Sequence, residues 1–259
     1  MPRQPRIHSN TGIYHIMIRG INKEKIFIKG FYKSKILQII KEIHEEIDFS
    51  LISYCVMDNH LHLLIKAAKT ELTIFMKKLN IKYAMFYNRL EERYGHVFQD
   101  RFRSEAVEDD SYLLGAFRYI HNNPVKARVT NNILDYKWSS ARDYIKQESD
   151  IIDSKYLTEM LGLFDNVNDF IEFHNLDDNI IYIDTNEEEN EKISSIVNNT
   201  IEEFINKYKF TDQRQVSQDK KEELAKILLN LRLCSLKEIA SYCNLSLRNV
   251  NEVNKKLKS

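Results

Sequence analysis

The stretch MDNHLHLLIK, residues 57–66, places two histidines one residue apart in a run of bulky apolar side chains. Such a run is typical of a β-strand, on which successive side chains point to opposite faces. His60 and His62 therefore share one face, about 6 to 7 Å apart along the strand, whereas Leu61 and Leu63 point into the core. Two imidazoles at this spacing can converge on one metal ion. Histidines whose hydrogen bonds are satisfied within the protein are the alternative, so the hypothesis needs a third partner.

The segments around this stretch alternate between strand and helix patterns. Asp58 and Asn59 suit a tight turn with left-handed backbone. Strands are predicted at residues 13–20, 49–57, 60–67 and 104–109. Apolar spacing predicts helices at residues 32–47, 70–95, 110–124 and 136–145. This order predicts an α+β fold, with a ferredoxin-like antiparallel sheet, helices, and a mainly helical C-terminal region.

The best candidate for the third partner lies in YIHNNPVKA, residues 119–127. Tyr119 and Asn123 are four residues apart, so they project from the same face of the helix predicted at 110–124. Asp110 or Ser111 is expected to cap this helix and Pro124 to end it. Because a residue before proline disfavours the helical backbone, Asn123 is expected at a frayed helix end.

These residue types suit phosphate chemistry. An amide oxygen beside two imidazoles is a plausible ligand set for Mg²⁺ or Mn²⁺. A phenol is a poor nucleophile at neutral pH, and a Lewis acid that draws charge from a phosphate oxygen compensates for this. The expected product is a covalent phosphotyrosine at Tyr119. The alternative for Tyr119 is an aromatic packing residue in the core.

HLHLL after an Asp-Asn turn is an HUH motif, in which U is a bulky apolar residue. Together with YIHNNPVKA, YHIMIRGINKEKIF (residues 14–27) and GHVFQDRFRSEAV (residues 95–107), it resembles the single-tyrosine HUH transposases of insertion sequences, nearest to their REP-associated branch. The resemblance covers about residues 8–145 and implies an HUH endonuclease fold.

The resemblance also implies an activity. A metal-dependent endonuclease would cleave and rejoin single-stranded DNA at a hairpin or palindromic repeat, through a 5′-phosphotyrosine intermediate that leaves a free 3′-hydroxyl. It makes Tyr119 the nucleophile and His60, His62 and Asn123 the metal ligands. Relatives often carry Gln in place of Asn123. The alternative function is a DNA-binding regulator of the same fold that does not cleave.

Basic and aromatic side chains in the same part of the chain suit contact with a DNA strand. The predicted phosphate contacts are Arg19, Lys23, Lys78, Lys82, Arg101 and Arg103. Tyr83, Phe86 and Tyr87 would either stack on bases or form the buried stripe of the helix at 70–95. His121 would hold a phosphate or stand in as a ligand, with a surface hydrogen bond as the alternative.

Charge divides the chain into three parts, although the whole sequence has a formal net charge of zero. Residues 1–145 carry +7 (23 Lys and Arg, 16 Asp and Glu), residues 146–213 carry −12 (5 and 17), and residues 214–259 carry +5 (10 and 5). The predicted domains follow these parts: an HUH tyrosine nuclease domain at 1–145, an acidic linker or helical connector at 146–213, and a helix-turn-helix-like domain at 214–259. Within the acidic part, residues 146–190 are expected to be an exposed linker or loop, with a helix at 165–175.

The C-terminal part has the pattern of a helix-turn-helix. Ser235 and Ser246 are expected to cap two helices, and Asn244 suits a left-handed position between them. Arg248 and Lys255 lie on the outer face of the second helix, which would enter the major groove of duplex DNA. A three-helix interaction module without DNA binding is the alternative.

Composition limits the other classes. The sequence is 29% charged and lacks a run of about 20 apolar residues, which argues against a membrane protein. Three cysteines without paired spacing suit a reducing compartment, so a cytoplasmic, nucleoid-associated protein is expected. Relatives of this type include dimers that share active sites and others that act alone, which leaves a homodimer open.

Overall fold

The computed structural model describes residues 8–99, 101–176, 182–183, 185–208, 217–231 and 233–258. The chain divides into two compact units, residues 1–183 and 184–259. The predicted boundary at residue 145 lies inside the first unit, and the one at residue 213 lies outside the described residues. Within these residues, no helix combines the length and apolar character that crossing a bilayer requires.

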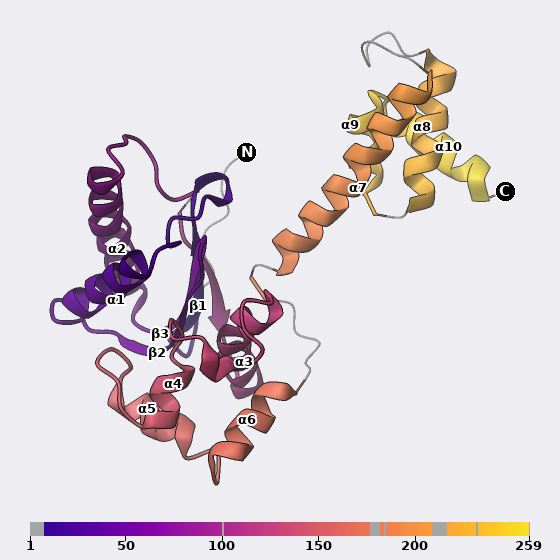
Figure 1. The fold of residues 1–259 in the computed structure, drawn as a ribbon. Coiled ribbons are helices and arrows are strands. Elements are labelled where there is room, and N and C mark those ends of the chain that lie inside the picture. The colour runs from indigo at the N-terminus through magenta and orange to yellow at the C-terminus, as the bar shows by residue number, and fades with distance from the viewer. Residues whose placement is uncertain are drawn as a thin grey trace. The chain divides into compact units, whose positions relative to one another are not determined.

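The first unit is built on a four-stranded antiparallel sheet in the order β2-β3-β1-β4 (Figure 1). The strands are β1 (Ile13–Arg19), β2 (Ser50–Val56), β3 (His60–Lys66) and β4 (Arg103–Val107). The α+β fold and the antiparallel sheet are therefore confirmed. The order matches the ferredoxin-like arrangement, in which β1 and β3 are central neighbours.

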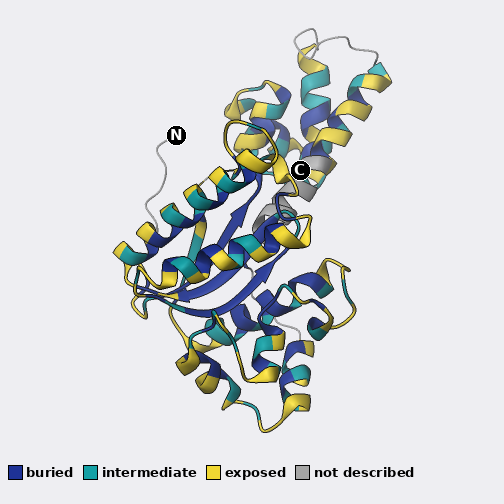
Figure 2. Ribbon diagram, turned by 60° about the vertical axis from the view of Figure 1, so that its left-hand side comes forward, coloured by how far each residue is buried: buried dark blue, intermediate teal, exposed yellow. Residues whose placement is uncertain are grey.

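Helices cover both faces of this sheet, so its three longer strands are almost wholly buried (Figure 2). Helices α1 (Gly30–His44) and α2 (Lys69–Leu90) pack together on one side, and α3 (Asp110–Lys126) lies on the other (Figure 1). A short 3-10 turn, η1 (Ile21–Lys23), follows β1. The face that α3 covers is the face on which the histidine pair lies.

The ends of α3 differ from the prediction. Asp109 is the N-cap, because its side chain accepts a hydrogen bond from the Tyr112 N–H at 2.8 Å. The helix also runs past Pro124 and ends at Lys126. Proline lacks only its own N–H, and helical bonding resumes when the Ala127 N–H donates to the Asn123 carbonyl at 3.0 Å. Asn123 therefore lies inside a formed helix, not at a frayed end.

Short helices complete the first unit after α3. They are η2 (Ile133–Asp135), α4 (Ala141–Lys146), α5 (Ser154–Leu161) and α6 (Val167–Asn175). The helix predicted at 136–145 is shorter than expected, and the helix predicted at 165–175 is present. The prediction of an exposed loop for 146–190 is wrong where α5 forms, and both α5 and α6 bury apolar side chains against the first core.

The second unit is helical and has its own core. It contains α7 (Thr185–Tyr208), α8 (Gln218–Leu231), α9 (Leu236–Cys243) and α10 (Leu247–Lys258). Ser235 caps α9 in a capping box with Glu238, and Asn244 takes the left-handed conformation at φ 49°. The Ser246 hydroxyl accepts from the Asn249 N–H at the start of α10. These three local predictions are confirmed.

Candidate active site

Strand β3 presents the two predicted histidines on one face of the sheet. The rings of His60 and His62 have centroids 4.9 Å apart and are nearly perpendicular, at 89°. His62 is fully buried and His60 is 9% exposed. On β1, Arg19 and Met17 pair with these two positions, so the side chains of Arg19, Met17 and His15 share their face.

Helix α3 brings the other two predicted residues to this pair. The Asn123 Oδ1 lies 3.2 Å from His60 Nε2, and its Nδ2 lies 3.4 Å from His62 Nε2. The Tyr119 ring lies edge-on to His62, with centroids 5.7 Å apart. The structure therefore gathers His60, His62, Asn123 and Tyr119 between β3 and α3, and their chemical roles stay predictions.

Two further residues orient the imidazoles. His60 Nδ1 donates to the Asn59 Oδ1 at 2.7 Å, and His62 Nδ1 lies 3.1 Å from His15 Nε2. Both bonds leave the Nε2 atoms directed at Asn123. Asn59 was expected only as a left-handed turn residue, yet neither it nor Asp58 has a positive φ. No motif singles out His15, whose role depends on the pairing of β1 with β3.

The donor set fits a divalent cation. With its Nδ1 proton directed to Asn59, His60 has a lone pair on Nε2 that faces the lone pairs of Asn123 Oδ1. Two acceptors that face each other are complementary to a cation, and outer hydrogen bonds of this kind are typical of ligating histidines. No group of three or more His, Cys, Asp or Glu side chains is placed to hold a metal within the described residues. Among the predicted ligands, Asn123 is the one that supplies an oxygen atom at this position.

The candidate nucleophile is covered by a second tyrosine. The rings of Tyr119 and Tyr182 are stacked with centroids 4.2 Å apart, and the two residues are 4% and 1% exposed. Tyr182 also contacts the rings of Tyr112 and His15. The Lys126 ammonium lies 4.6 Å from the centre of the Tyr119 ring. Sequence reasoning missed Tyr182 because it lies far along the chain in a segment without a motif.

His121 points away from the site, so both expectations for it are wrong. It is fully buried, with Nδ1 2.9 Å from His174 Nε2 and Nε2 2.8 Å from the Ser140 Oγ. His174 in turn donates from Nδ1 to the Phe170 carbonyl at 2.7 Å. Burial holds the pKa of His121 well below its ordinary value and lowers the pKa of His174 to about 4. The two imidazoles are therefore neutral, and the hydrogen bond between them joins α3 to α6.

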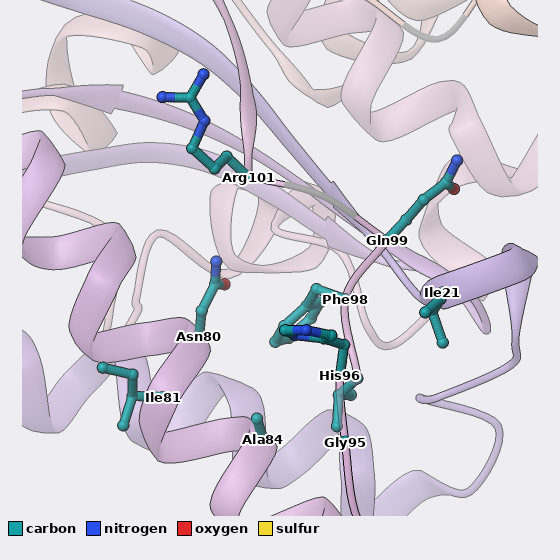
Figure 3. A pocket seen from close by; sticks show the side chains of 10 residues that line it. Ile21, Asn80, Ile81, Ala84, Gly95, His96, Phe98, Gln99 and Arg101 are labelled. Carbon is teal, nitrogen blue, oxygen red and sulfur yellow. The ribbon is translucent and has the colours of Figure 1, made fainter.

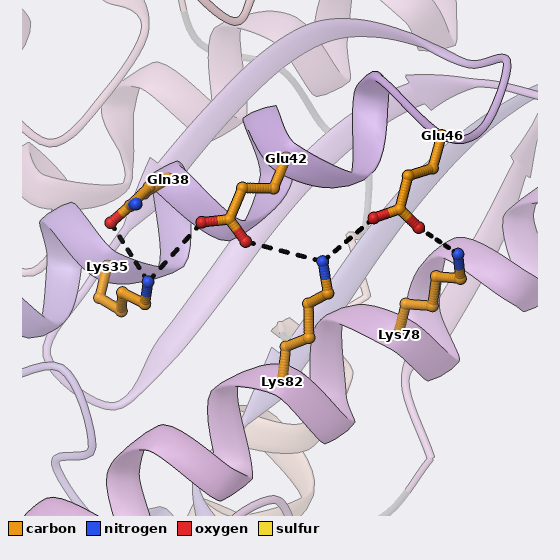
Figure 4. Close-up of polar contacts among 6 residues, drawn as sticks. All are labelled: Lys35, Gln38, Glu42, Glu46, Lys78 and Lys82. Atoms are coloured by element: carbon orange, nitrogen blue, oxygen red, sulfur yellow. Dashed lines mark hydrogen bonds and ion pairs between the residues drawn. The ribbon is translucent and has the colours of Figure 1, made fainter.

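Two predicted phosphate contacts on α2 are already paired with carboxylates. Lys78 and Lys82 both bind Glu46 of the loop after α1, and Lys82 also lies 3.6 Å from Glu42 (Figure 4). Hydrogen bonds from the two lysines lower the pKa of the Glu46 carboxyl. Helix α2 is on the side of the sheet opposite α3 (Figure 1), and Asn123 of α3 contacts the histidine pair.

The aromatic residues of α2 belong mainly to the core. Tyr83 is fully buried and its hydroxyl donates to the Ile26 carbonyl at 2.6 Å, and Tyr87 is 6% exposed. Phe86 is half-buried, with its ring edge-on to Tyr32. The buried-stripe alternative therefore describes Tyr83 and Tyr87.

The other basic residues lie at different places around the sheet. Arg19 is buried beside His60, with its Nη2 3.8 Å from the Met17 sulfur. Lys23 is exposed in η1. Arg101 and Arg103 are exposed near the start of β4, where Arg103 pairs with Met17 and so lies on the histidine face.

The two predicted contacts of the second unit lie on α10. Arg248 and Lys255 are both exposed, and Arg248 forms an exposed ion pair with Glu252 at 3.2 Å. Val250 and Val253, on the opposite side of α10, are buried. Helix α10 thus has one buried apolar face and one exposed face that carries the two cations.

Comparison with known proteins finds similarity to transposases in the first part of the chain. Residues 8–123 match the model of the family described as "Transposase IS200 like", so this part of the chain is similar to transposases of that family. The sequence is 24% identical over 159 residues to a protein of Haemophilus influenzae named "Putative REP-associated tyrosine transposase", across 57% of this chain and 90% of the relative.

Two solved structures are also similar. The structure of a REP-associated tyrosine transposase bound to a REP hairpin has a TM-score of 0.46 and 16% identity, and the match covers 56% of this chain and 86% of that one. A "putative transposase" from Deinococcus radiodurans has a TM-score of 0.34 and 16% identity, with coverage of 47% and 97%.

Proposed function

We propose that this protein acts as a transposase that cleaves and rejoins single-stranded DNA through a covalent bond to Tyr119. The observation that carries the proposal is the meeting of Tyr119 with His60, His62 and Asn123 between α3 and β3. The resemblance of the sequence to single-tyrosine HUH transposases supports a hairpin or palindromic repeat as the substrate. The competing function, a DNA-binding regulator that does not cleave, has no need for a phenol beside two oriented imidazoles.

The proposed reaction is a transfer of one phosphodiester to the enzyme. The Tyr119 oxygen forms a bond to phosphorus while the bond from phosphorus to the 3′ oxygen breaks. The phenolic proton passes to water, and the departing oxygen takes up a proton to become a free 3′-hydroxyl. The 5′ phosphate stays on Tyr119, and attack by a 3′-hydroxyl on this phosphotyrosine restores a continuous strand.

His60, His62 and Asn123 would hold Mg²⁺ or Mn²⁺. When bound, the cation would draw charge from a phosphate oxygen and make the phosphorus more susceptible to a phenol. Asn59 and His15 would hold the two rings in the orientation that keeps each Nε2 available.

The nucleophile is tested by adduct formation on a hairpin oligonucleotide with Mg²⁺ or Mn²⁺. The wild-type protein should form a covalent protein-DNA adduct that migrates slowly in a denaturing gel, and Tyr119→Phe should form none. Tyr94→Phe is the matched control, because Tyr94 is 98% exposed and far from the site in sequence. Equal behaviour of the wild type and Tyr119→Phe would show that Tyr119 is not the nucleophile.

The metal-binding role is tested separately from DNA binding. His60→Ala should lose metal-stimulated cleavage but keep most of its affinity for the hairpin, because the sheet still presents the basic side chains. His44→Ala, at an exposed histidine of α1, should keep both. Metal-stimulated cleavage that survives in His60→Ala would argue against this site.

We further propose that the second unit binds duplex DNA through α10. Its support is the capped α9, the left-handed Asn244 and the exposed cations of α10, which is the order of parts in a helix-turn-helix. Lys255→Gln should weaken duplex binding and reduce the salt dependence by about one counterion. Lys226→Gln, on the exposed side of α8, is the control. Equal salt dependence in the wild type and Lys255→Gln would contradict this role.

A further inference from the structure

A hollow of about 510 Å³ lies between α2 and the segment that precedes β4 (Figure 3). Its volume is within the range of small-molecule sites in proteins. One wall comes from α2 and the other from residues 95–99 and 101, and the side chains that matter here are Asn80, Ile81, Ala84, His96, Phe98 and Arg101. None of these except Arg101 belongs to the predicted DNA contacts.

The lining combines an apolar surface with a few polar groups, as binding sites for flat ring systems do. Phe98 is half-buried and packs on Tyr83, with ring centroids 5.9 Å apart. Ile81 is 49% exposed although it is strongly apolar. Figure 3 shows Phe98 and His96 on the same wall of the hollow, across from the α2 residues Asn80, Ile81 and Ala84. An aromatic ring of this kind is a stacking partner for a base.

A buried polar atom in the hollow lacks a partner. The Asn80 Oδ1 is buried and makes no hydrogen bond within the described part of the chain. Figure 3 shows the Asn80 amide extending from α2 into the space between this helix and the segment with Phe98 and Arg101. Buried polar atoms without partners are rare in native proteins, and an amide is well suited to the edge of a base.

Strand pairing links the hollow to the candidate active site. The Ile21 N–H donates to the Val97 carbonyl and the Gln99 N–H to the Arg19 carbonyl, both at 2.9 Å, so residues 97–99 lie beside the end of β1. On the other side of β1, Arg19 pairs with His60. Two strand spacings, about 10 Å, therefore separate the wall of the hollow from the strand of the histidine pair.

We propose that this hollow binds one unpaired base of the substrate strand. The inference rests on the proposed function, since it names the part of the strand that the protein recognises. Arg101 at the hollow and Arg103 on the histidine face place two guanidinium groups along the path between the two sites. Phe98 stacks on the base, the Asn80 amide accepts a hydrogen bond from its edge, and the arginines contact the backbone.

The test measures binding without metal, so that no strand is cleaved. The probes are a fluorescent hairpin with a single-stranded flank and a series in which one flank position at a time lacks its base. For the wild type, one position should lower the affinity about tenfold when its base is removed. Ala84→Phe, which fills the hollow, should lower the affinity for the intact probe to a similar degree and should not respond to the missing base at that position.

Met85→Phe is the matched control, because Met85 is adjacent on α2, 69% exposed and outside the hollow. It should behave as the wild type. Asn80→Leu is a second variant that removes the amide, and it should reproduce part of the loss at the same position. The proposal is overturned if Ala84→Phe binds the intact probe as tightly as the wild type does. It is also overturned if removal of the base lowers the affinity of Ala84→Phe by the same factor as that of the wild type.

The adduct assay with Tyr119 keeps the two proposals separate. If no substrate gives an adduct but the losses of Ala84→Phe and the missing base coincide, the base site stands and the cleavage proposal fails. If the adduct forms and no flank position responds, the base site fails and the cleavage proposal stands.

Discussion

At the residue scale, the candidate site depends on hydrogen bonds that fix two imidazoles. The HxH pattern and the tyrosine four residues before an asparagine were sufficient to predict which side chains would meet. His15 and Asn59 were not predictable as their partners. The position of His15 follows from the register of β1 against β3, and the role of Asn59 follows from a turn whose backbone differs from the expected left-handed form.

Substitution of Asn123 is the most direct test of the proposed metal ligands. Asn123→Leu keeps the side-chain volume but removes the oxygen, so the apparent affinity for Mn²⁺ should fall by about tenfold or more. Asn123→Asp restores an oxygen donor and should recover binding. Titration calorimetry with Mn²⁺ alone measures both, and an unchanged affinity in Asn123→Leu would exclude the amide from the metal site.

The stacked ring of Tyr182 predicts restricted access to Tyr119. Tyr119 is only 4% exposed and its ring is stacked on that of Tyr182, so we expect this ring to restrict the approach of a phosphate to the hydroxyl. Tyr182→Ala should therefore increase the initial rate of adduct formation severalfold. Tyr182→Phe keeps the stacked ring and should match the wild type. A slower rate in Tyr182→Ala would mean that the ring positions the nucleophile instead of covering it.

At the element scale, the spacing of apolar residues predicted the strands and the long helices correctly, whereas acidic composition led to the wrong prediction of a loop. The strands and the helices α1, α2 and α3 bury wide apolar faces, so their positions in the sequence were clear within a few residues. Helix α6 was predicted, but helix α5 was missed because it lies in an acidic segment whose composition resembles a solvated loop. The continuation of α3 past Pro124 was also missed, because a proline usually ends a helix. Only the structure shows that the Ala127 N–H bonds to the Asn123 carbonyl and so continues the helix.

The contact between α3 and α6 predicts a dependence of stability on pH. His121 and His174 are buried and neutral, and their pKa values lie below the ordinary value of about 6.5 that an unfolded chain has. Between pH 6.5 and pH 4 the unfolded chain binds more protons, so the folded protein loses stability as the pH falls through this range. His174 alone should contribute a loss of about 2 kcal/mol between pH 7.5 and pH 5.

Urea unfolding at these two pH values measures this loss. In His174→Gln the difference between pH 7.5 and pH 5 should be smaller than in the wild type, because one of the two groups no longer titrates. The carboxyl groups that titrate in the same range are common to both proteins and cancel in the comparison. An identical pH dependence in the two proteins would contradict the assignment.

At the scale of the whole molecule, each compact unit has its own hydrophobic core. The charge pattern predicted a basic N-terminal part and a basic C-terminal part, and the C-terminal helices were recognisable from their caps. The extent of the first unit was not predictable, because α4, α5 and α6 join its core through scattered apolar side chains and not through a motif.

Separate cores predict that the second unit can be unfolded without loss of the first. Val250 is fully buried in α10, so Val250→Asp places an uncompensated charge in the second core and should destabilise it by more than about 4 kcal/mol. The half-exposed Asn254→Asp is the control. Duplex binding should be lost in Val250→Asp, whereas adduct formation on a hairpin should persist. Loss of both activities would show that the units do not fold independently.

The stacked ring of Tyr182 also determines how much of the first unit a complete site needs. Tyr182 comes after α6, whereas His60, His62, Asn123 and Tyr119 all come before it. A shortened protein that ends at residue 176 would keep all four predicted site residues, but the phenol of Tyr119 would lose its aromatic neighbour and become open to solvent.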